Sequence, residues 1–229
     1  WNIGAEGQYI LGGLAGTGIA LLTHDMSGPW ILPLMVLAGI VGGMAWAAIP
    51  ALLKTRLQVN EILTSLMLTY VAIQLLNYLV IGPWKDPRGM GFPQTVMFTA
   101  EQTLPRIIPG TIVHAGVLVA FAVALIAWFV MGRSVFGFSV KVVGSAPNAA
   151  RYGGFSVNRT VWMTLLLSGG LAGLAGILEV AGPFGRMVPS FPTNYGFTAI
   201  IVAFLGRLHP IGAIFAGLAI ALTVVGGEV

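Results

Sequence analysis

The polar side chains that could do chemistry are concentrated in one apolar run, residues 60–82. Six of them would fall on two narrow arcs of a single helix: Glu61, Ser65 and Thr69 at i, i+4 and i+8, and Tyr70, Gln74 and Asn77 further along. Polar groups at membrane depth are costly and tend to face the interior of a helix bundle or a water-filled route. Hydroxyls and amides of this kind are suited to binding a polar molecule as it passes.

Each arc also has a structural interpretation. Glu61 could be an interfacial carboxylate at the positive end of its own helix, close to Lys54 and Arg56. The deeper arc of Tyr70, Gln74 and Asn77 could line a pathway or could serve only for hydrogen bonds between helices.

A second polar group lies near the start of the chain. Glu6 and Gln8 stand among glycines and apolar residues, at the beginning of another long apolar run. They are candidate pathway residues, and the alternative is that Glu6 is a buried carboxylate that accepts hydrogen bonds from helix ends.

The residue types exclude several kinds of chemistry. The chain has no cysteine, which removes disulfides, thiolate nucleophiles and Cys-ligated metals. We find no set of three metal ligands, no Ser/His/Asp arrangement and no pair of inward carboxylates, so we expect neither catalytic residues nor a metal site. The pattern Gly-x-x-x-x-Gly-Lys-[Ser/Thr] is also missing, so energy from ATP would have to come through a partner.

Composition indicates an integral membrane protein. Hydrophobic residues make up 57% of the chain and charged residues only 8%, whereas a soluble domain carries roughly a quarter charged residues. The net charge of +4 does not indicate nucleic-acid binding. More than half of the lysines and arginines gather in two loops, at positions 54, 56, 133, 141, 151 and 159. That pattern sets topology and suits anionic lipid headgroups.

We expect one transmembrane domain over residues 1–229, an all-α bundle of about six to seven spans. The expected spans are 4–23, 30–49, 60–82, 112–131 and 158–181, followed by a broken pair, 197–206 and 211–226. The basic connections 50–59 and 132–157 would be cytoplasmic, and 24–29 and 83–111 would lie outside. We see no signal peptide, and both ends of the sequence suggest a fragment of a longer chain.

The last pair is unusual. Residues 197–206 would give a helix of only about 15 Å, half a bilayer. Gly206-Arg-Leu-His-Pro210 then turns the chain. We expect a short, broken or re-entrant helix, since irregular backbone at that depth needs cover from protein or a water-filled cavity.

Small residues predict how the spans meet. Gly12 and Gly16 recur at four-residue spacing in the first span, and Gly169, Gly173 and Gly176 lie on neighbouring rows of the fifth. Lipid supplies no hydrophobic force between helices, so close backbone approach through small residues has to hold them together.

The cytoplasmic loop 132–157 contains a short helix between breakers. Pro147 suits the first turn, Ala149 and Ala150 favour helix, and Gly153 with Gly154 ends it. A short helix of small residues on the cytosolic side is suited to contact a partner.

Several segments together resemble one protein family. They are Gly4–Gln8, Glu61–Tyr70, Gly82–Pro87, Val143–Gly153, Ser168–Gly176 and Gly196–Gly206. As an ordered set they resemble the membrane permease subunit of bacterial ATP-binding-cassette (ABC) importers of the ribose/branched-chain amino acid group, in the nucleoside and simple-sugar branch. The resemblance covers nearly the whole chain.

The resemblance implies the rest of a transporter in the bacterial cytoplasmic (inner) membrane. The implied partners are a second permease subunit (a copy or a paralogue), two ATPase subunits, an extracytoplasmic substrate-binding protein and membrane lipid. This chain would bind no cofactor, because ATP and Mg²⁺ would be held by the ATPase. The residues that correspond to the family's coupling segment are Gly144, Pro147, Ala149, Ala150, Arg151, Tyr152 and Gly153.

The resemblance favours nucleosides as substrates, with simple sugars or branched-chain amino acids as alternatives. Stacking surfaces and a few amide or hydroxyl partners would be needed. Besides the deeper arc of 60–82, Phe197 and Thr198 offer that chemistry. An ion-coupled transporter would instead require charges deep in the spans, and a channel would require a filter segment, which only 197–206 weakly suggests.

Overall fold

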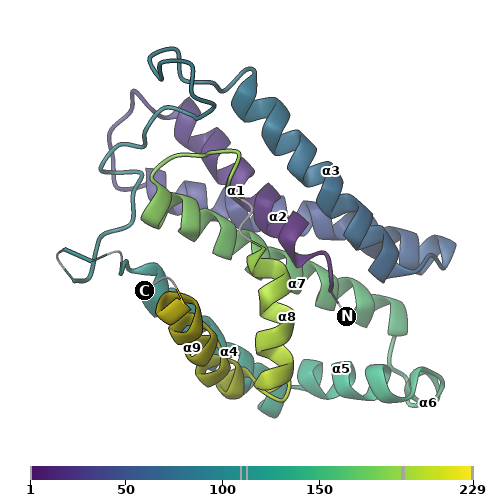
Figure 1. Ribbon diagram of the computed structural model, residues 1–229. Helices are drawn as coiled ribbons and strands as arrows, with labels where there is room; N and C mark the ends of the chain where they lie inside the picture. Colours follow the sequence, from purple (N-terminus) through teal and green to yellow (C-terminus); the bar gives the residue numbers. More distant parts are fainter. Residues whose placement is uncertain (1, 109, 112, 192–193, 228–229) are drawn as a thin grey trace. The chain divides into compact units, whose positions relative to one another are not determined.

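The computed structural model describes residues 2–108, 110–111, 113–191 and 194–227, and regular secondary structure in this part of the chain is entirely helical. The predicted all-α class is therefore confirmed. The elements, shown in Figure 1, are α1 (Ala5–Leu22), α2 (Ile31–Leu57), α3 (Glu61–Ile81), α4 (Gly116–Arg133), α5 (Val135–Ser145), α6 (Pro147–Tyr152), α7 (Val157–Glu179), the π-helix η1 (Val180–Phe184), α8 (Tyr195–Leu205) and α9 (Pro210–Gly227).

Four of these helices are long and apolar enough to cross a membrane, namely α2, α3, α4 and α7 continued by η1. The pair α8 and α9 adds a fifth candidate, bent by 119° at its break. The count is lower than six to seven because α1 does not pass the same test: Glu6, Gln8 and its many glycines make it less apolar. The polytopic membrane architecture is confirmed, and α1 falls outside the candidate spans.

The chain forms two compact units. The first comprises Trp1–Gly116 and Trp162–Gly196. It therefore contains α1, α2, α3, η1 and the part of α7 from Trp162 onward. The second contains Val117–Val161 and the chain from Phe197 onward.

Helix α1 is the centre of the first unit. It contacts α2 and α3, and its glycines lie against α7, so that Figure 1 shows it between α3 and α7. The two apolar residues Ile10 and Leu14 are at most 3% exposed. In contrast, the outward faces of α2 and α3 carry exposed leucines, valines and methionines, as expected for surfaces in contact with lipid.

Glycines allow α1, α2 and α7 to touch through their backbones. A methyl group built on Gly43 of α2 would lie 2.8 Å from the Cα of Gly173 on α7, and one built on Gly12 of α1 would lie 2.6 Å from the Gly173 carbonyl carbon. Real side chains do not approach so closely, so these positions have room only for hydrogen. Gly173 is therefore the point at which three helices meet.

The other glycines singled out by spacing lie at the same seam. A methyl group on Gly169 would lie 2.7 Å from the Gly43 carbonyl oxygen, and one on Gly176 would lie 3.0 Å from the Gly13 nitrogen. Gly16 faces Ile177, whose Cγ1 would be 2.5 Å from an added methyl. Close backbone contact of this kind supplies the van der Waals attraction that holds helices together in lipid.

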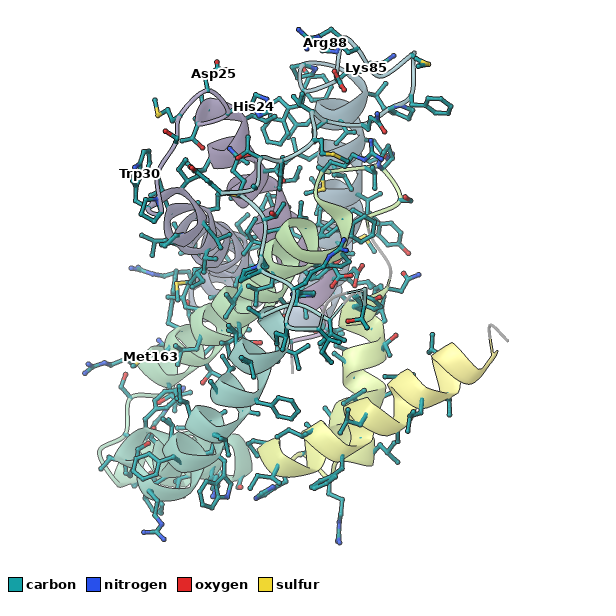
Figure 2. The ribbon with its side chains drawn as sticks, turned by 90° about the vertical axis from the view of Figure 1, so that its left-hand side faces the viewer. His24, Asp25, Trp30, Lys85, Arg88 and Met163 are labelled. Carbon is teal, nitrogen blue, oxygen red and sulfur yellow. The ribbon has the colours of Figure 1, made fainter. Side chains whose placement is uncertain are left out.

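The connections after α1 and after α3 lie at the same end of the first unit. Figure 2 shows His24, Asp25, Lys85 and Arg88 gathered there. The Gln102 side chain donates to the Ala20 carbonyl at 2.8 Å, and the Gly28 N–H donates to Glu101. Both connections were predicted to lie outside, and these contacts agree with a shared side of the membrane.

Lys54 and Arg56 lie near the end of α2, in the first unit. The Trp162 indole donates to the Thr55 hydroxyl at 2.9 Å, which brings the start of α7 beside the end of α2. Arg159 comes three residues before Trp162, and Lys54 and Arg56 flank Thr55. The basic connection 50–59 therefore lies beside Trp162 within the first unit.

The second unit contains α5, α6, α9 and α8 from Phe197 onward. The Ser134 side chain ends α4 by donating to the Val130 carbonyl at 2.6 Å, and it begins α5 by accepting from the Gly137 N–H at 3.0 Å. Between α8 and α9, Arg207 and Leu208 both adopt left-handed backbone conformations, with φ of 55° and 56°. This turn produces the break predicted at 206–210.

We expect Gly173→Leu to destabilise the protein by several kcal/mol, because a large side chain would have to separate three backbones; overpacking by a few methylenes already costs about 1–3 kcal/mol. Thermal unfolding of the purified protein in detergent measures the loss. Gly132→Leu is the matched control, since an added methyl at Gly132 of α4 meets nothing within 4 Å. Equal losses of stability in both variants would contradict the close contact of α1, α2 and α7 at Gly173.

Candidate functional site

The first arc of α3 is closed by α1. Ser65 and Thr69 are only 4% and 2% exposed. A methyl group on Gly4 would lie 2.5 Å from the Ser65 Cβ, and one on Gly7 would lie 3.1 Å from the Thr69 hydroxyl oxygen. Both hydroxyls donate within their own helix, to the carbonyls of Ile62 and Ser65, each at 3.1 Å.

Ser65 and Thr69 therefore do not line an open route in this structure, which corrects the prediction that they belong to a pathway. The physical reason is that glycines in α1 let its backbone close directly over the small hydroxyl side chains. Polar residues on a membrane helix can equally serve a helix–helix contact.

The second arc lies on the surface of the first unit. Tyr70 is 61% exposed, Gln74 is exposed, and Asn77 is half-buried and donates to the Gln74 side chain at 3.4 Å. Tyr78, 69% exposed, extends the row. We call Tyr70, Gln74, Asn77 and Tyr78 the α3 polar stripe. Amides and phenols on a surface at membrane depth need a polar neighbour or water.

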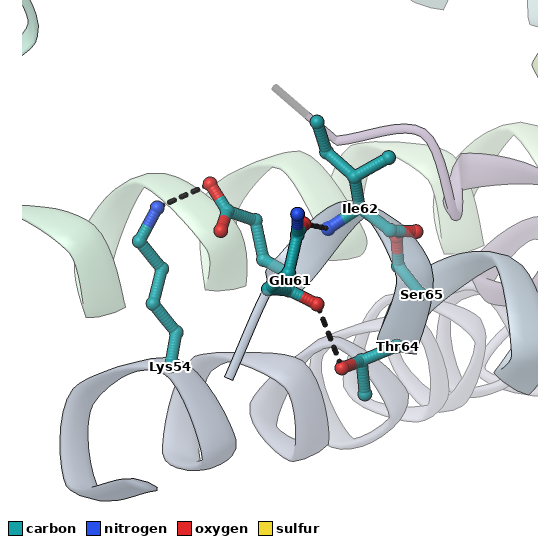
Figure 3. A network of polar contacts seen from close by, with 6 residues as sticks. Lys54, Glu61, Ile62, Thr64 and Ser65 are labelled. Atoms are coloured by element: carbon teal, nitrogen blue, oxygen red, sulfur yellow. Dashed lines mark hydrogen bonds and ion pairs between the residues drawn. The ribbon is translucent and has the colours of Figure 1, made fainter. Parts of the chain in front are cut away.

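At the start of α3 the polar groups are engaged with one another. Asn60 caps the helix by accepting from the Ile62 N–H at 2.9 Å, and its carbonyl accepts from the Thr64 hydroxyl at 2.9 Å. Figure 3 shows Lys54 of α2 reaching the Glu61 carboxylate, with which it forms an ion pair. Glu61 thus adopts the interfacial role considered as its structural alternative.

Glu6 is buried, with 1% exposure, and both of its carboxylate oxygens are occupied. Oε1 accepts from the Asn194 N–H at 3.1 Å, and Oε2 accepts from the Gly196 N–H at 2.6 Å. These are the amides at the start of α8, so the carboxylate caps a helix far away in sequence. This arrangement is the helix-end alternative, and it corrects the assignment of Glu6 to an open pathway.

Gln8 is also used internally. It is 1% exposed and exchanges two hydrogen bonds with the Asn2 side chain, at 2.6 and 3.1 Å. Asn2 in turn donates to the Ser168 hydroxyl of α7 at 2.8 Å. The prediction that Gln8 faces a pathway is therefore also corrected, because a buried amide satisfies its hydrogen bonds with the nearest polar partners.

Helix α6 is the predicted short helix. Pro147 stands at its first turn, and Gly153 ends it by donating to the Ala149 carbonyl at 3.0 Å. Gly154 follows with a φ of +81°, a conformation that glycine adopts without strain. Tyr152 projects from the end of α6 and is 95% exposed.

Six of the seven predicted coupling residues, all except Ala150, are exposed. Ala150 has 0% exposure, and its carbonyl accepts from the Phe155 N–H at 2.9 Å. It therefore packs inside the segment and is not available for a partner, which corrects its assignment to a docking surface. One side of α6 is exposed to solvent, and the Ala150 methyl lies on the side that faces the protein.

The remaining candidates begin α8. Phe197 and Thr198 are half-buried in the first turns of that helix, in the second unit. Residues 117–161 of the same unit contain four basic and no acidic residues: Arg133, Lys141, Arg151 and Arg159. A surface of this charge attracts acidic partners or anionic headgroups.

Several important residues escaped the sequence analysis although a signal existed. Gly39 and Gly43 of α2 carry the same four-residue spacing that marks α1 and α7. Tyr78 lies eight residues after Tyr70 and four after Gln74, on the same arc. Asn2, by contrast, has no periodic signal because it precedes the helix.

Comparisons with known proteins assign the whole chain to one family. The family described as branched-chain amino acid transport system / permease component matches residues 1–229. A glucose ABC transporter permease protein of Haloferax volcanii is 44% identical over 238 residues, which cover 100% of this chain and 62% of that protein. A guanosine ABC transporter permease protein of Bacillus subtilis is 32% identical, with coverage of 94% and 62%.

A nucleoside ABC transporter permease protein of Lactococcus lactis is 28% identical, with coverage of 95% of this chain and 62% of that protein. The chain thus spans 62% of the length of each of these three relatives. No solved structure matches the chain.

Burial predicts different outcomes for two glutamines. Gln8→Leu should lower the free energy of unfolding by about 1–3 kcal/mol, because it leaves the Asn2 amide without its reciprocal partner. Gln74→Leu is the matched control on the exposed α3 polar stripe and should change it by less than about 0.5 kcal/mol. Thermal or denaturant unfolding in detergent compares the two, and an equal response would mean that burial does not distinguish them.

Proposed function

We propose, because this chain belongs to the family described as branched-chain amino acid transport system / permease component, that it forms the transmembrane permease subunit of an ABC importer. The observation that carries the proposal is the exposed, basic α5–α6 segment in a chain that matches this family from end to end. The chain lacks the phosphate-binding motif of ATPases, so a separate ATPase subunit would hold ATP and Mg²⁺ and supply the energy.

In this proposal the tip of α6 contacts the ATPase. Arg151 and Tyr152 are exposed beside Gly153, and the charged residues of the segment 117–161 are all basic. A guanidinium that pairs with carboxylates on an acidic rim would orient the contact. Because Ala150 is buried, the exposed tip residues would make the contact, and Ala150 would keep the short helix attached to α5 and Phe155.

Movement at the tip would reach the membrane through α7. The segment after α6 leads within a few residues into α7, a single helix from Val157 to Glu179. Gly173 and Gly176 of α7 lie against backbone atoms of α2 and α1. Small shifts and tilts between packed helices are a recognised way to open and close a transporter, and a glycine seam opposes them less than interdigitated side chains would.

The proposal includes further partners. Two guanosine permease proteins of Bacillus subtilis both match this chain, at 32% and 26% identity, which supports a second permease subunit, either a paralogue or a copy. Two ATPase subunits and an extracytoplasmic substrate-binding protein would complete the assembly in the cytoplasmic membrane.

For the substrate we favour nucleosides, recognised in passing by the α3 polar stripe. The rings of Tyr70 and Tyr78 can stack on a base, and the amides of Gln74 and Asn77 can bond to ribose hydroxyls or base edges. Simple sugars are the second candidate, because the relative from Haloferax volcanii that is 44% identical is named as a glucose permease.

Charge reversal at the tip tests the ATPase contact. Arg151→Glu should weaken the affinity for the ATPase subunit by at least about tenfold, because a like charge would face the acidic rim. Lys141→Glu, the same change on α5 of the same segment, is the matched control and should have a smaller effect. Co-purification at graded salt measures both, and retention of the ATPase by Arg151→Glu would overturn the proposed contact.

The stripe is tested by uptake. Gln74→Ala and Asn77→Ala should each reduce nucleoside uptake by the assembled transporter several-fold, because each removes a hydrogen-bonding group worth roughly 1 kcal/mol. Tyr70→Ala should impair uptake of labelled nucleoside more than Tyr70→Phe, which keeps the ring. If uptake is intact in all of these variants, the stripe is not the route, and if only labelled glucose is taken up, the second candidate holds.

A further inference from the structure

The Glu6 carboxylate stands at a junction in the chain. Its two acceptors take the N–H groups of Asn194 and Gly196, and the chain passes from the first unit to the second between Gly196 and Phe197. The hydrogen bonds therefore attach the last residues of the first unit to the start of α1. We call this arrangement, Glu6 with the amides of Asn194 and Gly196, the Glu6 latch.

Gly196 and Glu6 are closely packed against each other at the latch. A methyl group on Gly196 would lie 2.6 Å from the Cα of Glu6 and 2.9 Å from its Cβ. One turn further along α1, the Tyr9 ring stacks on Phe191, with centroids 4.7 Å apart and planes 4° from parallel, and meets Tyr195 edge-on at 6.3 Å. Two positions on α1 thus contact Phe191 and the residues Asn194–Gly196.

The partners recorded for the Glu6 carboxylate are two backbone N–H groups. Among the residues that the structure describes, the single recorded ion pair is that of Lys54 with Glu61. A buried carboxylate without a cation is stable only if several N–H groups are directed at it, and the start of a helix provides them together with the positive end of the helix dipole.

A side-chain cap from a residue next to α8 would not connect α8 to α1. Helices are usually capped by a Ser, Thr, Asp or Asn immediately before their first turn, and such a local cap would order α8 without tying it to any other helix. Here the cap comes from α1, 188 and 190 positions away in sequence. The cap therefore fixes where α8 starts relative to α1.

We propose that Glu6 is a positioning residue that makes the start of α8 move with α1. This inference rests on the proposed function, in which α1 is displaced through its glycine contacts with α7. With the latch intact, displacement of α1 carries the Asn194–Gly196 segment with it and so reaches the first turn of α8. Without the latch, only the ring contacts of Tyr9 and the packing of Gly196 on Glu6 connect the segment to α1, and less of the displacement reaches α8.

Hydrogen exchange tests the latch in the full-length permease within its assembled complex. In Glu6→Ala, the amides of Asn194 and Gly196 should exchange about tenfold faster or more, since hydrogen bonds to a charged acceptor are lost. Glu6→Gln, which keeps one acceptor and the shape of the side chain, should give a smaller increase. Glu179→Gln, a carboxylate removed from α7, is the matched control and should leave these amides unchanged. Unchanged exchange in both Glu6 variants would overturn the latch.

A second readout separates positioning from stability alone. In Glu6→Gln, the number of substrate molecules moved per ATP hydrolysed should fall at least severalfold while the unfolding temperature stays near that of the unmodified protein. A lowered unfolding temperature with an unchanged transport-to-hydrolysis ratio would show a purely structural role and overturn the positioning claim. If the unmodified complex neither hydrolyses ATP nor moves substrate, the proposed function fails instead, and hydrogen exchange still decides whether the latch exists.

Discussion

The contact on which the rest of the structure depends is the meeting of the α1, α2 and α7 backbones at Gly173. In lipid, apolar side chains gain nothing by leaving one hydrocarbon environment for another, so helices adhere through close van der Waals contact and hydrogen bonds. Gly12 and Gly43 bring their helices near enough for backbone atoms to supply that contact. Glu6 and Gln8, the polar residues near the start of α1, are buried in the same unit.

The close approach explains how α1, which is not among the candidate membrane spans, can be enclosed within its unit. Once its backbone lies against α3 and α7, Glu6 and Gln8 cannot reach water and must satisfy their hydrogen bonds inside the protein. They do so with the start of α8 and with Asn2. Polar residues that would be costly in lipid thereby become fixed links between distant parts of the chain.

The surfaces left for other molecules are correspondingly few. The α3 polar stripe presents amides and phenols away from the core of its unit, and the tip of α6 presents Arg151 and Tyr152 on a background of positive charge. One surface is suited to a small polar molecule and the other to an acidic protein. The proposed permease function would use both surfaces, one for the substrate and one for a separate ATPase.

The sequence by itself determined the helical class, the membrane location, the break at 206–210 and the glycine spacing, because these follow from local composition and periodicity. It also predicted the short helix at Pro147. Tertiary structure alone decided which polar residues are available: Ser65 and Thr69 share an arc with Glu61 in sequence, yet α1 covers them, whereas Tyr70 stays open. Periodicity tells which residues share a face of a helix, but burial depends on which neighbour covers that face, and that neighbour is set by contacts between residues far apart in the chain.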